Sequence, residues 1–249
     1  MERKIGSIFM GVRINKFLAD AGVASRREAD KLVEAGVVYI NGVVAANAMR
    51  VEDTDEVLVY GKRVRRCEEQ HVIAYYKPVG VTCTQKDSHA KITIADVVKY
   101  PVQLNYAGRL DRDSEGLLLL TNDGMLIEQM MRGANGHEKE YIVRTDKKIT
   151  EQFLDKMRKG VYLKELETTT RPCEVMMVGE YTFRIVLTQG LNRQIRRMCK
   201  TFGYQVTKLK RVRVMNILLK DLKEGEWRRI TGDELDELNR LSNMSVGEK

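Results

Sequence analysis

"GRLDRDSEGLLLLTNDG" (residues 108–124) places four acidic residues around a run of four leucines. The run from Leu117 to Leu120 is short and wholly apolar, which is typical of a strand buried on both faces. Residues 108–115 are therefore expected to form a loop at the edge of a hydrophobic core. A carboxylate in that loop needs a nearby cation to remain ionised at neutral pH, because burial raises its pKa. The stretch thus predicts the centre of the fold and a reactive acid beside it.

The same acids also fit part of a calcium-binding loop. Asp111, Asp113, Glu115 and Gly116 fall on the first, third, fifth and sixth positions of an EF-hand. The bidentate Glu that such a loop requires at its last position is Asn122 here, and the preceding positions are leucines instead of polar residues. A calcium site is therefore excluded.

Composition narrows the function classes. The chain has 249 residues, of which 43% are hydrophobic, and this length suits a small domain followed by a medium one. Its cysteines and histidines are scattered without metal-ligand spacing, which argues against a disulfide framework and for a reducing cytosol. There is no P-loop or GxGxxG motif for a nucleotide. We expect a cytoplasmic protein that uses neither a metal nor another cofactor and has no membrane partner.

The charge distribution favours a polyanionic partner. The net charge is +8, and residues 181–213 contain nine lysines and arginines but no acid. A field of one sign attracts nucleic acid. The alternative is a basic face that is merely solvated.

The first sixty residues predict two short helices and a hairpin. Apolar residues recur with helical spacing over residues 14–21, and Ser25 and Glu28 form a capping box for a second helix. Asn41-Gly42 lies between β-rich runs, as in a type I′ turn.

This stretch, "RINKFLADAGVASRREADKLVEAGVVYINGVV" (residues 13–44), resembles the small RNA-binding domain shared by ribosomal protein S-four, tyrosyl-tRNA synthetases and several RNA-modifying enzymes. The resemblance implies that its two helices bind RNA phosphates. The alternative is a generic helical pair with ordinary surface charge. The candidate RNA contacts on the polar sides of the helices are Arg13, Lys16, Arg26, Arg27 and Lys31.

The charged stretch 61–70 is predicted to be a linker between an S-four-like domain (12–60) and a second domain (71–242). In the second domain strands outnumber helices and do not alternate with them, which indicates an α+β fold on a mainly antiparallel sheet. One of its helices is expected to begin at an Asn192 N-cap and to end at Gly203.

A basic surface, a buried acid and nearby arginines, without a nucleotide motif, suggest base chemistry by one carboxylate. Three further segments support this, in order YYKPVGVTCT (75–84), KEYIVRT (139–145) and QGLNRQIRRMCKTFGYQVTKLKRVRV (189–214). Together with residues 108–124, they resemble the motifs of the pseudouridine synthases. The similar branch is the RsuA/RluB/RluE/RluF family, which carries an N-terminal S-four-like domain.

The resemblance implies a role for several residues. Asp111 matches the essential aspartate, which attacks the ribose C1′ of a uridine or otherwise assists glycosidic cleavage before the uracil rejoins through C5. Tyr141 matches the tyrosine that packs against the flipped base, and Arg196 matches the arginine that pairs with the aspartate. Leu209 is expected to form a wall of the uracil pocket. No cofactor is implied.

The remaining candidates are expected to contact the substrate uridine or the RNA around it. Arg109 and Lys77 are expected to contact the substrate, although Lys77 has the alternative of stabilising the sheet edge. Arg196 has the alternative of a phosphate contact, and Asp113 is expected to be only a loop or salt-bridge acid. The predicted RNA contacts in this domain are Arg193, Arg197, Lys208, Lys210 and Arg211.

The pair Met215-Asn216 distinguishes one member of this branch. It implies, as substrate, one uridine of large-subunit ribosomal RNA, with a transfer RNA as a further substrate, for an enzyme expected to be a monomer. Two alternatives stay open. One is a sibling synthase that acts on another ribosomal uridine, and the other is a non-catalytic RNA-binding or ribosome-assembly factor.

Overall fold

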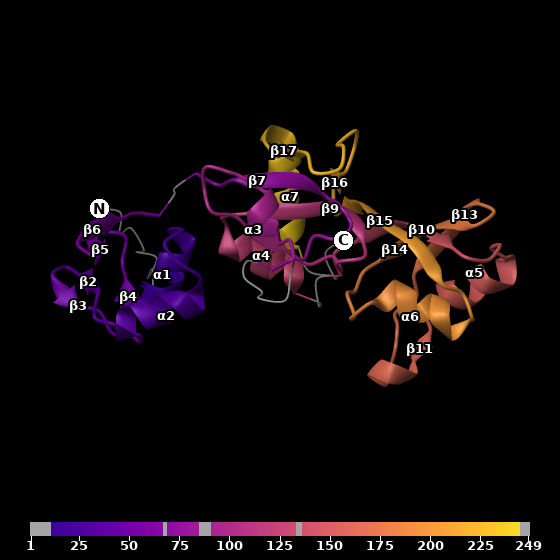
Figure 1. The fold of residues 1–249 in the computed structure, drawn as a ribbon, viewed down its shortest axis with the longest axis horizontal. Coiled ribbons are helices and arrows are strands. Elements are labelled where there is room, and N and C mark those ends of the chain that lie inside the picture. The colour runs from indigo at the N-terminus through magenta and orange to yellow at the C-terminus, as the bar shows by residue number, and fades with distance from the viewer. Residues whose placement is uncertain (1–10, 67–68, 85–90, 133–135, 245–249) are drawn as a thin grey trace, which may run out of the picture. The chain divides into compact units, whose positions relative to one another are not determined.

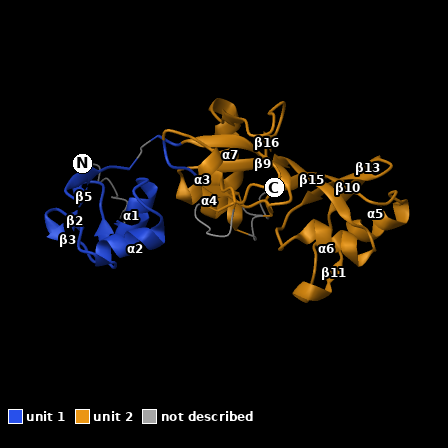
Figure 2. Ribbon diagram, viewed as in Figure 1, with its two compact units in different colours: residues 1–70, 102–104 blue, residues 71–101, 105–249 orange. Residues whose placement is uncertain are grey.

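The computed structural model describes residues 11–66, 69–84, 91–132 and 136–244 (Figure 1). The chain divides into two compact units, residues 1–70 with 102–104 and residues 71–101 with 105–249 (Figure 2). Of the cysteines and histidines, Cys67 and His89 lie outside the described residues. Across the described ranges, no helix combines the length and apolar character that crossing a membrane requires.

The N-terminal unit packs two helices against a small sheet. Its helices are α1 (Ile14–Asp20) and α2 (Arg26–Glu34). Its strands are β1 (Val12–Arg13), β2 (Val38–Ile40), β3 (Val43–Val44), β4 (Arg50–Val51), β5 (Val57–Val59) and β6 (Lys62–Val64). The strand order is β3-β2-β5-β6, and β1 pairs separately with β4.

Local signals in this unit act as the sequence predicts. The Ser25 backbone N–H donates to Glu28 Oε2 at 3.1 Å, and Ser25 Oγ accepts from the Glu28 N–H at 3.4 Å, so the capping box is confirmed. Asn41 and Gly42 have φ angles of 50° and 80°, as a type I′ turn requires. The buried apolar core of the unit includes Ile14, Leu18, Ala29, Val33, Val38 and Val57.

The stretch expected as a linker differs in the structure. Strand β6 begins at Lys62 and pairs with β5 through a turn at Tyr60 and Gly61, where φ is 50° and 72°. A tyrosine with positive φ is not a usual turn signal, because its Cβ makes that conformation costly. The sequence pattern therefore did not indicate this hairpin. Residues 67 and 68 of the expected linker lie outside the described residues.

The second unit is built on a nine-stranded sheet. Its strands are β7 (Val72–Lys77), β8 (Asn105–Ala107), β9 (Glu115–Thr121), β10 (Lys139–Thr145), β13 (Glu174–Gly179), β14 (Thr182–Leu187), β15 (Val206–Val214), β16 (Ile217–Leu218) and β17 (Trp227–Arg229). A separate ribbon pairs β11 (Tyr162–Leu163) with β12 (Thr168–Thr169), around the short 3-10 helix η2 (Lys164–Leu166). The helices are α3 (Ile94–Val97), α4 (Gly124–Met131), α5 (Glu151–Arg158), α6 (Gln194–Thr201) and α7 (Gly232–Asn243).

The sheet is mainly antiparallel, so the predicted α+β fold is confirmed. Its order is β13-β14-β10-β15-β9-β7-β17, and the neighbours β15 and β9 run parallel. Helices α5 and α6 supply apolar side chains to a core with β10, β14 and β15. Helices α4 and α7 supply a second core with β7 and β9 (Figure 1). The strands β15 and β9 therefore join two halves of the unit, each with its own core.

Gly116 makes this junction possible. It pairs with Arg211 and has a φ of 106°, and a Cβ at this position would lie 2.2 Å from the Arg211 carbonyl oxygen. That is far inside van der Waals contact with rigid backbone, and the φ is one that L-residues rarely adopt. Strands β9 and β15 can pair this closely only around a glycine.

Gly116→Ala is therefore expected to destabilise the second unit by about 3 kcal/mol or more, because collision and backbone strain add. Gly179→Ala is the matched control, since its Cβ would meet its nearest atom at 3.7 Å. Urea unfolding measures both variants. Equal midpoints for the two alanine variants would contradict the proposed close approach.

Candidate active site

The acidic loop is fixed by its backbone. Strand β9 is buried along its whole length, which confirms the expected strand at Leu117 to Leu120. In the loop that precedes it, the Gly80 N–H donates to the Arg112 carbonyl at 2.8 Å, and the Ser114 N–H donates to the Asp111 carbonyl at 3.1 Å. These bonds fix the loop backbone at Asp111, whose side chain is about one-third exposed (34%).

Lys77 holds the same loop from inside. Its side chain is 0% exposed, and its Nζ donates to the carbonyl oxygens of Pro78 and Ser114, both at 2.8 Å. Burial lowers the pKa of this ammonium group. The predicted contact between Lys77 and the substrate is therefore wrong, because the ammonium is enclosed behind the loop. Of the predicted alternative, the structural role agrees with these bonds, but they stabilise the loop and not a sheet edge, since β7 lies between β9 and β17.

A cavity of about 540 Å³ opens beside the loop, within the volume range of ligand sites. It is lined by Asp111 and Arg109 from the loop, Tyr141 from β10 and Leu209 from β15. These four predicted site residues come from three distant segments, and the fold brings them to one place. An acid, an aromatic ring and an apolar wall around such a volume suit a flipped base.

Arg193 is the cation that contacts Asp111. Its Nη1 lies 3.6 Å from Asp111 Oδ2, and it also donates to both oxygens of Asp113, at 3.0 and 2.8 Å. The hydrogen bonds from Arg193 hold the pKa of the Asp113 carboxyl below its usual value. Asp113, expected to be a loop or salt-bridge acid, is thus the main anchor of this arginine.

The predicted pairing of Arg196 with Asp111 is not present. Arg196 Nη2 donates to the Asp113 carbonyl at 2.7 Å, and its Nη1 donates to the Val206 carbonyl at 3.1 Å. Helix α6 has Arg193 as its N-cap, with a φ of 51°, instead of the predicted Asn192. Arg193 therefore lies at the start of the helix, beside the loop of Asp111. Arg196 lies further along the helix and contacts the backbone of that loop.

The basic segment 181–213 is neutralised by acids from elsewhere in the chain. Glu140 on β10 accepts from Arg184 Nε at 2.6 Å and from Arg213 Nε at 2.9 Å, and its side chain is 15% exposed. Glu165 contacts both Arg197 and Lys200. A segment without acids in sequence is therefore not a field of unpaired charge in space.

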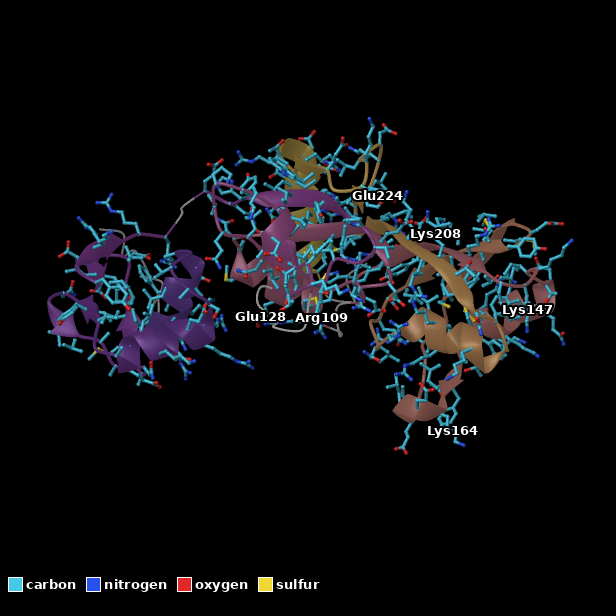
Figure 3. The ribbon with its side chains drawn as sticks, in the orientation of Figure 1. Arg109, Glu128, Lys147, Lys164, Lys208 and Glu224 are labelled. Carbon is cyan, nitrogen blue, oxygen red and sulfur yellow. The ribbon has the colours of Figure 1, made fainter. Side chains whose placement is uncertain are left out.

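The other predicted RNA contacts in this segment are also engaged. Lys208 Nζ lies 3.1 Å from Glu115 Oε1, and Lys210 Nζ lies 4.8 Å from the centre of the Tyr76 ring. In Figure 3, Lys208 lies along β15, well apart from Arg109. Arg211 is 2% exposed, so its predicted contact with RNA phosphates is wrong: the strand directs its side chain into the protein.

The basic residues of the N-terminal unit are different. Arg13, Arg26, Arg27 and Lys31 are exposed, Lys16 is partly exposed, and none forms an ion pair within the part of the chain that the structure describes. These unpaired cations lie on α1 and α2 and, for Arg13, on β1 directly before α1, and they are available to phosphates without first breaking an internal contact.

A cavity that combines an acid, an aromatic ring and an apolar wall is suited to an enzyme that acts on a nucleobase. Residues 71–201 match the RNA pseudouridylate synthase family, and residues 12–57 match the S4 domain. The chain is 45% identical to the dual-specificity RNA pseudouridine synthase RluF of Escherichia coli K12, over 95% of this chain and 81% of that protein. It is 33% identical to the ribosomal large subunit pseudouridine synthase B of Bacillus subtilis, over 93% and 97%.

A crystal structure of a pseudouridylate synthase superposes with a TM-score of 0.67 at 27% identity, covering 92% of this chain and 99% of that one. The chain belongs to the pseudouridine synthase family, in the branch that carries an N-terminal S4 domain.

Glu140→Gln is expected to destabilise the second unit by about 2 kcal/mol near neutral pH, because two charge-assisted hydrogen bonds are lost. Hydrogen bonds from Arg184, then Arg213, lower the folded-state pKa of Glu140. Its contribution is therefore present above the unfolded pKa of about 4.3 and disappears as the pH falls through the folded value.

The unfolding free energies of wild type and variant should thus differ at neutral pH, approach each other as the pH falls below about 4.3, and converge below the folded-state pKa of Glu140. Glu165→Gln is the matched control, since Glu165 also faces two cations but its side chain is 53% exposed. The Glu165→Gln substitution should lower the free energy of unfolding by less than about 1 kcal/mol. If the difference in unfolding free energy between wild type and Glu140→Gln stays the same in acid, the ionised Glu140 carboxylate is not its cause.

Proposed function

We propose that the chain converts a specific uridine of RNA to pseudouridine through the Asp111 carboxylate. The observation that supports this most directly is the position of Asp111: on a loop fixed by backbone bonds, in a cavity that it shares with Tyr141 and Leu209. Arg193 Nη1 lies 3.6 Å from Asp111 Oδ2, and the shorter bonds of this arginine go to Asp113.

In this mechanism the uridine leaves the RNA stack and enters the cavity. Asp111 assists cleavage of the bond between C1′ and N1, either by attacking C1′ or by stabilising its positive charge. The uracil then turns and forms a new bond from C5 to C1′, after which C5 loses its proton and N1 gains one. Tyr141 packs against the base, since an aromatic ring stacks on any base.

We propose large-subunit ribosomal RNA as the substrate, with a transfer RNA as a further one. Support comes from the likeness to the dual-specificity and large-subunit synthases and from the Met215-Asn216 pair. In the structure this pair forms the turn between β15 and β16, where Met215 is buried and Asn216 Nδ2 donates to the Glu234 carbonyl at 2.8 Å. Neither residue lines the cavity. The proposed RNA substrate therefore rests on the likeness to the related synthases and not on a contact in the site.

Asp111→Asn should abolish pseudouridine formation in ribosomal RNA, because the amide keeps the shape of the side chain but not its charge. Asp123→Asn is the matched control: Asp123 caps α4 at the far end of the leucine strand, and Asn caps helices as well as Asp does. Release of tritium from RNA labelled at uridine C5 measures both. Full activity of Asp111→Asn, or no activity of the wild type, would favour a non-catalytic RNA-binding factor.

Replacing Arg26, Arg27 and Lys31 by alanine should weaken RNA binding and flatten its salt dependence. Each lost phosphate contact lowers the slope of log affinity against log salt by roughly 0.7–0.9, so the triple variant should lose about two units. Alanine at Arg197 and Lys200, which share Glu165, should change the slope much less. Equal changes in the two variants would contradict the distinction between unpaired and paired cations.

A further inference from the structure

Arg211 is a buried cation that has no acidic partner among the residues that the structure describes. It lies in β15 and is among the largest fully buried side chains of the protein, at 2% exposure. Its Nε donates to the Leu117 carbonyl at 2.7 Å, and its Nη1 donates to the Arg109 carbonyl at 3.4 Å. Within the described ranges it forms no ion pair, and its buried Nη2 has no hydrogen-bond partner. A charge buried in this way is costly unless a further interaction compensates it.

The position of the guanidinium indicates where that interaction is made. Its two carbonyl partners, at residues 109 and 117, stand on either side of Asp111 in sequence, so Arg211 reaches both ends of the loop that carries the acid. Arg211 also lines the cavity, together with Asp111, Tyr141 and Leu209. The residue that carries this unpartnered donor therefore forms part of the wall of the cavity in which the uracil is proposed to bind, although the donor atom itself is buried in that wall.

The charge of Arg211 fits the chemistry of bond cleavage, an argument that rests on the function proposed above. When the bond between C1′ and N1 breaks, its electron pair leaves with the uracil. The negative charge is then shared by N1 and the two carbonyl oxygens of the ring. A fixed guanidinium in a site that excludes water stabilises such a developing charge strongly.

We propose that Arg211 Nη2–H donates a hydrogen bond to a carbonyl oxygen of the uracil and stabilises the uracil anion formed on cleavage. Arg211 stays protonated throughout. The anion is consumed when C5 forms its bond to C1′, C5 loses its proton and N1 takes one up. This role makes Arg211 a catalytic residue beside Asp111, instead of a phosphate contact.

The test compares two leaving groups. Large-subunit ribosomal RNA is transcribed with uridine or with 5-fluorouridine, whose electron-withdrawing fluorine stabilises the departing anion. Single-turnover rates are measured from the C-glycoside found after nuclease digestion and chromatography. Arg211→Met should slow the uridine reaction by about 100-fold or more, as loss of one preorganised donor does. It should slow the 5-fluorouridine reaction several-fold less, because that leaving group needs less stabilisation.

Lys77→Met is the matched control. Lys77 is a second buried cation behind the same loop, but it does not line the cavity. Its loss should slow both substrates by the same factor, as a purely structural defect does. If Arg211→Met also slows the uridine and 5-fluorouridine reactions by the same factor, the proposal is overturned. If the wild type forms no product, the proposed function is overturned instead.

Foldedness is checked by thermal unfolding. Should Arg211→Met fail to fold, Arg211→Lys answers the same question, since it keeps a positive charge but has a different donor geometry. If Arg211→Lys slows the uridine reaction more than the 5-fluorouridine reaction, even by less than the factor expected for Arg211→Met, the proposal is supported. A loss equal for both substrates overturns it.

Discussion

The parallel pairing of β9 with β15 is the constraint on which the second unit depends. In the strand order, β13, β14 and β10 lie beyond β15, and β7 and β17 lie beyond β9. The ladder between the two halves is short, with Lys210 opposite Glu115 and Arg211 opposite Gly116. The loop of Asp111 leads directly into β9, and Tyr141 lies on the neighbour of β15, so the cavity forms at this junction.

The junction also determines how charge is arranged around the acid. Lys77 and Arg211 donate to backbone carbonyl oxygens and form no bond to the Asp111 carboxylate. Asp113 engages Arg193 and lies near Arg196, at 3.4 Å from its Nε. Four cations thus surround one short loop, while Asp111 has a single ion-pair contact, at 3.6 Å, among the described residues. The carboxylate of Asp111 therefore remains available to a substrate in the cavity.

Signals that depend on a few neighbouring residues could be predicted from the sequence. The capping box at Ser25, the turn at Asn41-Gly42 and the buried leucine strand all appear where expected, and the family motifs located the cavity wall at Tyr141 and Leu209. These features follow from backbone geometry and from the exclusion of apolar side chains from water.

Pairings across long distances could not be predicted. Whether Arg193 or Arg196 meets Asp111 depends on where α6 begins, because a shift of one residue turns each side chain by roughly a quarter of a turn. The neutralisation of Arg184 and Arg213 by Glu140 depends on the register of three strands, which no local pattern encodes. Charge in sequence therefore predicted a basic surface larger than the fold presents.

The hydrogen bond from Arg211 to the Leu117 carbonyl spans 94 residues of the chain. Contacts of this separation form late, since a long loop must close before they can contribute. During synthesis the N-terminal unit, which has its own core, leaves the ribosome first, and β15 follows long after Asp111. A nascent chain that ends before residue 206 therefore contains the complete N-terminal unit and the loop of Asp111, but no assembled cavity. The unit proposed to bind RNA is thus complete before the cavity proposed to modify it.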